Sequence, residues 1–136
     1  MNLKHERESI IKFLYLYEMN ELNFHDAVSN FNLASEEELS EVASEVAYNV
    51  VVNADEIDEI IEACLTNYSI KRLNLVDLQI IRLATYELMQ GDLAAGIIID
   101  EAINLSKEYS ELDDFKSSKF NNRLLDNIKN YLNERK

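Results

Sequence analysis

Apolar residues recur every three or four positions along most of the chain, a spacing typical of helices that bury one face. Ile10, Phe13, Leu14 and Tyr17 illustrate it, because they form one stripe along a helix. Similar stripes occur at 39–50, 57–65, 76–88, 98–109 and 120–132, and a shorter helix is predicted near 24–32. No segment alternates with the period of two that is typical of a half-buried strand. The pattern therefore predicts an all-α fold.

Signals for helix starts and ends accompany these stripes. Ser35 followed by Glu38 forms a capping box, in which a hydroxyl and a carboxylate satisfy free amides, so a helix is predicted to begin there. Gly91 suits the left-handed position just after a helix end, and Asp92 is a candidate start for the next segment. With 136 residues, 47% of them apolar, the chain is long enough for one core. We therefore expect one domain over residues 1–136, a bundle of about six to seven helices.

The composition also bears on the cellular compartment. The single cysteine, Cys64, cannot form an internal disulfide, which favours a reducing compartment. The first residues are charged, unlike a secretory signal. No apolar run approaches the roughly 18–20 residues of a membrane helix. We expect a cytoplasmic protein with no membrane association.

The net charge of −13 argues against a broad basic surface for nucleic acid. The excess is localised, however, because residues 36–62 hold ten acidic side chains and no lysine or arginine. Residues 1–20 hold three basic and three acidic side chains, and residues 71–136 hold ten and eleven. Both ends of the chain are thus nearly neutral, so a short RNA contact there remains compatible with the composition.

Catalytic motifs find no support in the sequence. His5 and His25 lack metal-ligand spacing with Cys64, which lies on an apolar stripe and is interpreted as a core residue. There is no phosphate-binding glycine loop. The carboxylate pairs at 100–101 and 113–114 are adjacent in sequence, so on a helix they point about 100° apart. We expect no enzymatic activity, no metal and no cofactor.

Four segments read RESIIKFLYLYE at 7–18, VDLQIIRLATYEL at 76–88, IIIDEAINLSKEYS at 97–110 and SKFNNRLLDNI at 118–128. Together they resemble the NusB family of all-helical bacterial transcription antitermination factors. The third resembles a family helix that ends in an Ala-Lys pair, and the fourth a Ser-x-Lys-Phe-x-Asn-Gly-x-Leu-Asp element. The resemblance implies a role in ribosomal RNA transcription: binding of boxA RNA together with NusE, a small-subunit ribosomal protein, within the transcription elongation complex.

The chain departs from the family pattern in several places. Ala94 stands where the family has a proline, Asp100 where it has an asparagine, and Arg123 where it has a glycine. The start of the chain also carries fewer basic residues than is usual in the family. An alternative function is therefore a NusB-like protein-interaction module that has lost RNA binding. The oligomeric state is left open by the sequence, a weak homodimer included.

The first helix supplies one set of RNA candidates. The resemblance makes Lys4, His5, Arg7 and Lys12 candidates for contacts with phosphates. The alternative is an ordinary solvated face, with Glu8 and Lys12 as an ion pair one turn apart.

The last segment supplies the other set. Lys119 is predicted to bind a phosphate, Phe120 to stack on a base, and Asn122 or its neighbour Asn121 to bond base edges or cap the helix. Alternatively, Phe120 begins an apolar stripe with Leu124 and belongs to the core.

The 76–88 helix supplies candidates for a protein partner. Asp77, Tyr86 and Glu87 are predicted to face NusE, against the alternative of a half-buried tyrosine and surface acids. Arg82 stands in an apolar run and is interpreted as part of a structural ion pair, with Glu101 as candidate partner.

Overall fold

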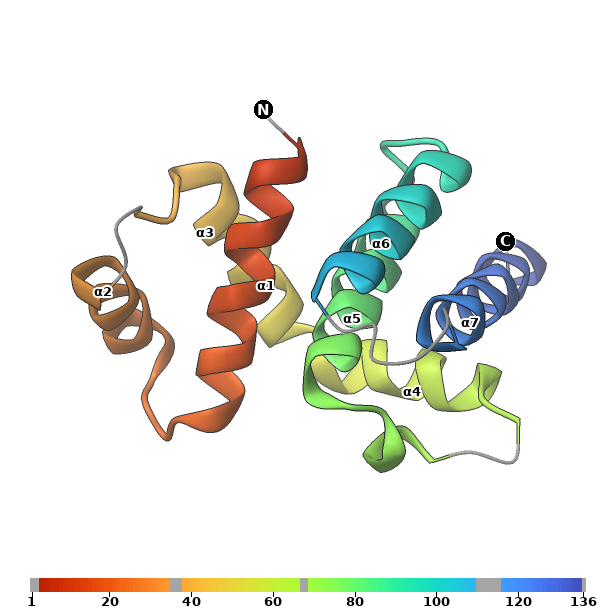
Figure 1. Cartoon of the computed structure of the whole chain (residues 1–136), viewed down its shortest axis with the longest axis horizontal. Helices are drawn as coiled ribbons and strands as arrows, with labels where there is room; N and C mark the ends of the chain where they lie inside the picture. The colour runs from red at the N-terminus through yellow and green to blue at the C-terminus, as the bar shows by residue number, and fades with distance from the viewer. Residues whose placement is uncertain (1–2, 35–37, 67–68, 110–115, 136) are drawn as a thin grey trace. The chain divides into compact units, whose positions relative to one another are not determined.

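The computed structural model describes residues 3–34, 38–66, 69–109 and 116–135. These residues form seven α-helices and one 3-10 helix, and none of them lies in a strand. The elements, labelled in Figure 1, are α1 (Leu3–Met19), α2 (Phe24–Ala34), α3 (Glu41–Val52), α4 (Ala54–Cys64), η1 (Ile70–Arg72), α5 (Leu75–Gln90), α6 (Ala95–Tyr109) and α7 (Lys116–Glu134). The all-α prediction is confirmed, including the short second helix.

The chain divides into two compact units, Met1–Val52 and Asn53–Lys136. Each is described by itself, and the single domain over the full chain stays a prediction. Among the described residues, no helix combines the length and the apolar character needed to cross a membrane.

The first unit packs α1 against α2 and α3. Ala43 and Ala47 are fully buried on α3, and such small side chains let the neighbouring α1 approach closely. Phe13 of α1 anchors an aromatic cluster, with its ring centroid 5.3 Å from that of Phe24 and 5.8 Å from that of Phe31. Both pairs meet edge to face, the geometry that aromatic quadrupoles favour.

The start of α3 corrects one prediction. Ser35 lies outside the described residues, and Glu38 precedes the helix, which begins at Glu41. The N-cap is Ser40, whose Oγ accepts a hydrogen bond from the Ala43 amide at 3.0 Å. The same hydroxyl donates to a carboxylate oxygen of Glu6 on α1 at 2.5 Å, so the cap also ties α3 to α1.

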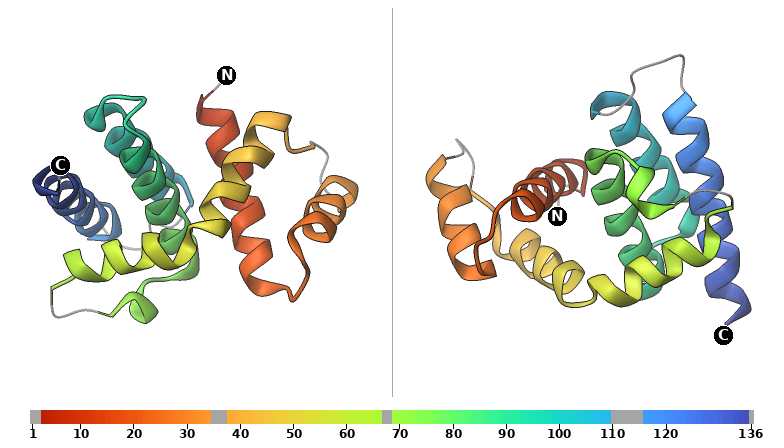
Figure 2. Two further views of the ribbon diagram at one scale, coloured as in Figure 1. Left: turned by 180° about the vertical axis from the view of Figure 1, so that it is seen from behind. Right: turned by 90° about the horizontal axis from the view of Figure 1, so that it is seen from below.

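The second unit is built around α5, which contacts α4, α6 and α7 (Figures 1 and 2). Ile80, Ile81 and Leu83 are all at most 2% exposed, although they point in different directions around the helix. A helix buried on most of its circumference needs neighbours on several sides. The three surrounding helices supply them, with Leu125 and Ile128 of α7 fully buried.

The ends of α5 are well defined. Asn74 caps the start, its side-chain oxygen accepting from the Asp77 amide at 2.8 Å. Gly91 ends the helix with φ +73, as predicted, and donates its amide to the Glu87 carbonyl. Asp92 does not begin α6, because Ala94 is the residue whose carbonyl accepts the first helical hydrogen bonds.

A bidentate salt bridge joins α4 to α5. Arg82 donates from Nε and from an Nη nitrogen to the two carboxylate oxygens of Asp58, both at 2.8 Å. The predicted structural ion pair is therefore present, with Asp58 as the partner and not Glu101.

Candidate nucleic-acid interface

The first turns of α7 place successive side chains on different sides of the helix. Ser118 and Asn121 are buried, at 3% and 1% exposure, whereas Lys119 and Asn122 are exposed. Phe120 is half-buried. Since neighbouring helical residues point about 100° apart, the buried Asn121 fixes the direction of the residues on either side. Phe120 is thus neither a full core residue nor a freely exposed ring.

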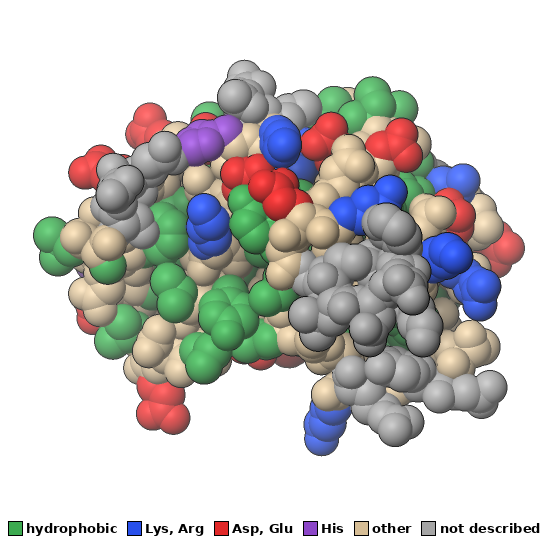
Figure 3. Space-filling view, viewed as in Figure 1, with side chains coloured by type: hydrophobic (Ala, Val, Ile, Leu, Met, Phe, Trp, Pro, Cys, Tyr) green, Lys and Arg blue, Asp and Glu red, His purple; other side chains and the backbone are tan. Residues whose placement is uncertain are grey.

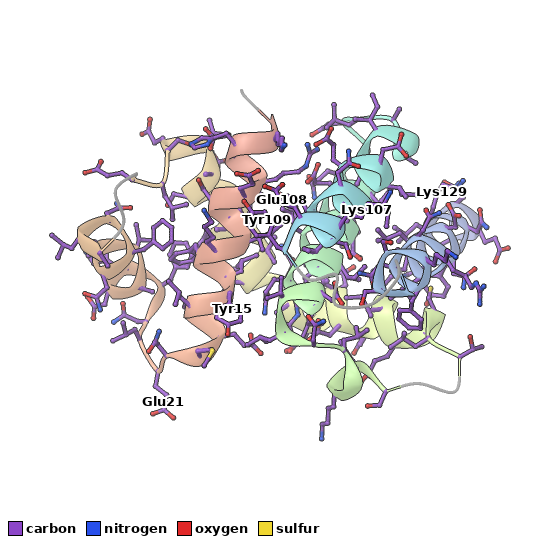
Figure 4. The ribbon with its side chains drawn as sticks, viewed as in Figure 1. Tyr15, Glu21, Lys107, Glu108, Tyr109 and Lys129 are labelled. Carbon is purple, nitrogen blue, oxygen red and sulfur yellow. The ribbon has the colours of Figure 1, made fainter. Side chains whose placement is uncertain are left out.

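A shallow groove runs between α6 and α7. Ile103 and Lys107 line it from α6, and Ser118, Lys119 and Asn122 line it from α7, around a volume of about 300 Å³. The structure therefore brings the predicted Lys119 and Asn122 together with Lys107, which Figure 4 labels on α6. The groove combines two ammonium groups, an amide and a hydroxyl beside an apolar side chain.

Lys107 was not among the predicted site residues. The signal that could have found it is the family's Ala-Lys pair, which reads Ser106-Lys107 in this chain. Only packing of α6 against α7 shows that Lys107 and Lys119 line the same groove.

A buried polar network lies behind this groove. One carboxylate oxygen of Asp77 accepts from Asn121 Nδ2 at 2.9 Å and from Ser106 Oγ at 3.3 Å. Asn121 Nδ2 also donates to Ser106 Oγ at 3.0 Å. The second Asp77 oxygen accepts from the Asn74 side chain at 2.9 Å. Three helices, α5, α6 and α7, thus meet at one carboxylate.

The partner candidates on α5 do not share one face. Asp77 is 5% exposed inside the network, which leaves it little surface for a partner. Tyr86 and Glu87 are half-buried. Nine residues separate Asp77 from Tyr86, which places them on opposite sides of the helix.

The candidates on α1 also differ from one another. Lys4, His5 and Lys12 are exposed and lie on one side of the helix. Arg7 is 3% exposed and points elsewhere, so it has little surface to offer to a phosphate. The RNA contacts of this set stay a prediction.

Two further observations concern metal-ligating and nucleophilic side chains. The described residues hold no cluster of three or more metal-ligating side chains. Partial burial raises the pKa of the Cys64 thiol, which disfavours the thiolate that a nucleophile requires. On the face shown in Figure 3, the described lysine and arginine side chains lie among acidic ones.

Comparison with known proteins gives consistent matches. The model of the NusB family matches residues 4–130. The chain is 37% identical over 129 residues to the transcription antitermination protein NusB of Listeria innocua serovar 6a, covering 94% of this chain and 96% of that protein. It is 35% identical over 133 residues to the NusB of Clostridium botulinum strain Alaska E43, covering 94% and 98%.

Solved structures agree with these matches. The chain resembles T. maritima NusB with a TM-score of 0.80 at 28% identity, over 96% of this chain and 92% of that one. It also resembles a chain in a crystal structure of the antitermination factors NusB and NusE in complex with dsRNA. That match has a TM-score of 0.74 at 28% identity and covers 96% and 99% of the two chains.

Proposed function

The chain belongs to the NusB family of transcription antitermination proteins, a non-enzymatic family, and from this premise we propose that it binds boxA-type single-stranded RNA together with the ribosomal protein NusE. The site proposed for the RNA is the groove between α6 and α7. A structurally similar chain crystallised in a complex of NusB and NusE with dsRNA, which supports NusE and RNA as joint partners.

The observation that carries the proposal is the set of side chains in the groove. Lys107 and Lys119 supply two cations for phosphates, and the Asn122 amide can both donate to and accept from a base edge. Phe120, half-buried next to Lys119, retains exposed surface on which a base can stack. Such a site suits an unpaired strand, whose bases are free to turn outward.

The exposed cations of α1 extend the proposal. Lys4, His5 and Lys12 are assigned to further phosphate contacts. Arg7 is left out of this set because it is buried.

For NusE, the proposed contacts are Tyr86 and Glu87 on α5, since both keep part of their surface exposed. Tyrosine is enriched at protein interfaces because it joins a large contact area to a polar tip. Asp77 is left out because it is buried. The protein would act within the transcription elongation complex, and hence in the bacterial cytoplasm.

Salt-dependent binding tests the proposal. A fluorescent boxA RNA is titrated with the protein, with and without NusE, at several salt concentrations. About two to four phosphate contacts predict a slope of log K against log salt near −0.7 for each contact. Lys107→Gln and Lys119→Gln should each make the slope shallower by about 0.7 and weaken binding.

Lys71→Gln is the matched control, because Lys71 is exposed on η1 in the same unit and does not line the groove. Its affinity and slope should equal those of the unmodified protein. If both groove variants also leave affinity and slope unchanged, the groove is not the RNA site.

The alternative function is a protein-interaction module without RNA binding, which the net charge of −13 favours. The same titration, together with a pull-down on immobilised NusE, separates the two. A module would be retained by immobilised NusE to the same extent with and without boxA RNA, and would show no affinity for the RNA in the presence of NusE.

A further inference from the structure

The buried network behind the groove has a geometric relation to the groove residues. Ser106 directly precedes Lys107 on α6, and Asn121 directly precedes Asn122 on α7. The inner member of each pair takes part in the hydrogen bond of 3.0 Å between the two helices, and the outer member lines the groove. That bond therefore sets how far α6 and α7 are shifted along each other at the level of the groove.

Asp77 fixes the third point of this arrangement. The carboxylate only accepts hydrogen bonds, so Asn121 must present its NH₂ group, which then also reaches Ser106 Oγ. Ser106 accepts from Asn121 and donates to Asp77, so its hydroxyl serves as both acceptor and donor in the network. Asp77 itself is held by Asn74 at the first turn of α5. Each polar group thus constrains the orientation of the next.

Burial makes this arrangement selective for one register. Ser106 is fully buried, Asn121 is 1% exposed and Asp77 is 5% exposed. Apolar side chains at these positions would tolerate small displacements, because dispersion contacts have no preferred direction. Buried hydrogen bonds do have one, and a buried carboxylate without its donors is costly. Sliding α7 along α6 would break these bonds.

We propose that Asp77, Ser106 and Asn121 are positioning residues that set the places of Lys107, Lys119 and Asn122 for reading unpaired bases. The inference rests on the proposed RNA function. None of the three network residues touches the RNA. Their effect falls on sequence discrimination, because hydrogen bonds to base edges require exact placement, whereas attraction to phosphates tolerates displacement.

The test compares two RNA probes of equal length, a boxA sequence and a scrambled sequence, each in the presence of NusE. The variant Ser106→Ala/Asn121→Val removes both bonds that Asn121 makes while keeping the positions filled. The ratio of the two affinities should fall about tenfold, which corresponds to about 1.4 kcal/mol. Affinity for the scrambled probe should change little, since both lysines remain.

Three further variants serve as controls. Asn127→Val makes the same chemical change at an exposed position of α7 and should keep the full ratio. Ser106→Thr keeps a hydroxyl and should keep most of it. Ser106→Ala alone leaves the bond between Asn121 and Asp77, so it should lower the ratio by less and supplies the test if the double variant does not fold.

The outcomes separate the two levels of the argument. If the unmodified protein prefers boxA and the folded Ser106→Ala/Asn121→Val variant shows the same preference, the network only stabilises the fold and the positioning inference is wrong. If the unmodified protein shows no preference for boxA with NusE present, the proposed function fails and the inference falls with it. Circular dichroism at the assay temperature confirms that each variant is folded.

Discussion

The salt bridge between Arg82 and Asp58 allows a prediction whose size follows from its geometry. Its two hydrogen bonds are parallel and both measure 2.8 Å. The Arg82 side chain is 12% exposed and that of Asp58 is 30% exposed. Exposed pairs contribute about 0.2–1 kcal/mol, and breaking a fully buried pair costs about 3–5 kcal/mol. Because this pair lies between the two limits, we expect a coupling energy of about 2 kcal/mol.

A double-mutant cycle measures this energy. Asp58→Asn, Arg82→Met and the double variant are unfolded in urea, and the cycle subtracts what each side chain does elsewhere in the fold. Each single variant should be less stable than the unmodified protein by about 2 kcal/mol or more. The double variant should lose less stability than the sum of the two single losses. The coupling should largely persist in 1 M salt, because the guanidinium is mostly shielded from solvent. A coupling energy below about 0.5 kcal/mol would refute the reasoning.

Two further predictions concern the glycines and the cysteine. Gly91→Ala should lower the free energy of unfolding measured in urea by about 1 kcal/mol, because Gly91 has φ +73. Gly96→Ala should leave it unchanged or raise it by up to about 1 kcal/mol, because Gly96 lies within α6 and a Cβ there would meet open space. Equal effects of the two changes would contradict this prediction. Because burial raises the pKa of the Cys64 thiol, a smaller fraction is thiolate near pH 8 than in the unfolded chain. Iodoacetamide should therefore modify the native protein more slowly than the urea-unfolded protein, and the gap should narrow as the pH rises above the native pKa; identical rates at pH 8 would contradict the expectation.

The spacing of apolar residues predicted which segments are helices, but it did not predict where each helix begins. Two serines, Ser35 and Ser40, are candidate N-cap residues for α3, and the pattern Ser35-x-x-Glu38 is the stronger local signal. Ser40 takes the role in the structure because its hydroxyl satisfies a helix amide and also reaches Glu6 on another helix. Local sequence carries the first of these contacts and not the second.

The candidate site residues also divide into those that local sequence predicts and those that depend on packing between helices. Lys119 and Asn122 are exposed in the groove, as the RNA contacts predicted from the 118–128 segment require. The burial of Asp77 and the role of Lys107 depend on how three helices pack, which no spacing along one helix reveals. The same holds for Arg82, whose partner lies 24 residues away on α4.

A net charge of −13 opposes the binding of RNA, which is itself a polyanion. Residues 13–70 contain thirteen acidic side chains and no lysine or arginine, so this stretch alone accounts for the net charge of −13. The remainder of the chain carries thirteen charges of each sign, and it includes the candidates on α1 as well as the groove between α6 and α7.

At physiological salt, charges separated by more than about 8 Å are largely screened, whereas a lysine in contact with a phosphate is not. The acidic stretch lowers the overall attraction of the protein for RNA, most strongly at low salt, whereas lysines in contact with phosphates still supply non-specific affinity. Contacts inside the groove are left to decide which RNA is held. For a factor that must find one short sequence among many transcripts, low background affinity raises the ratio of specific to non-specific binding, and that ratio sets occupancy.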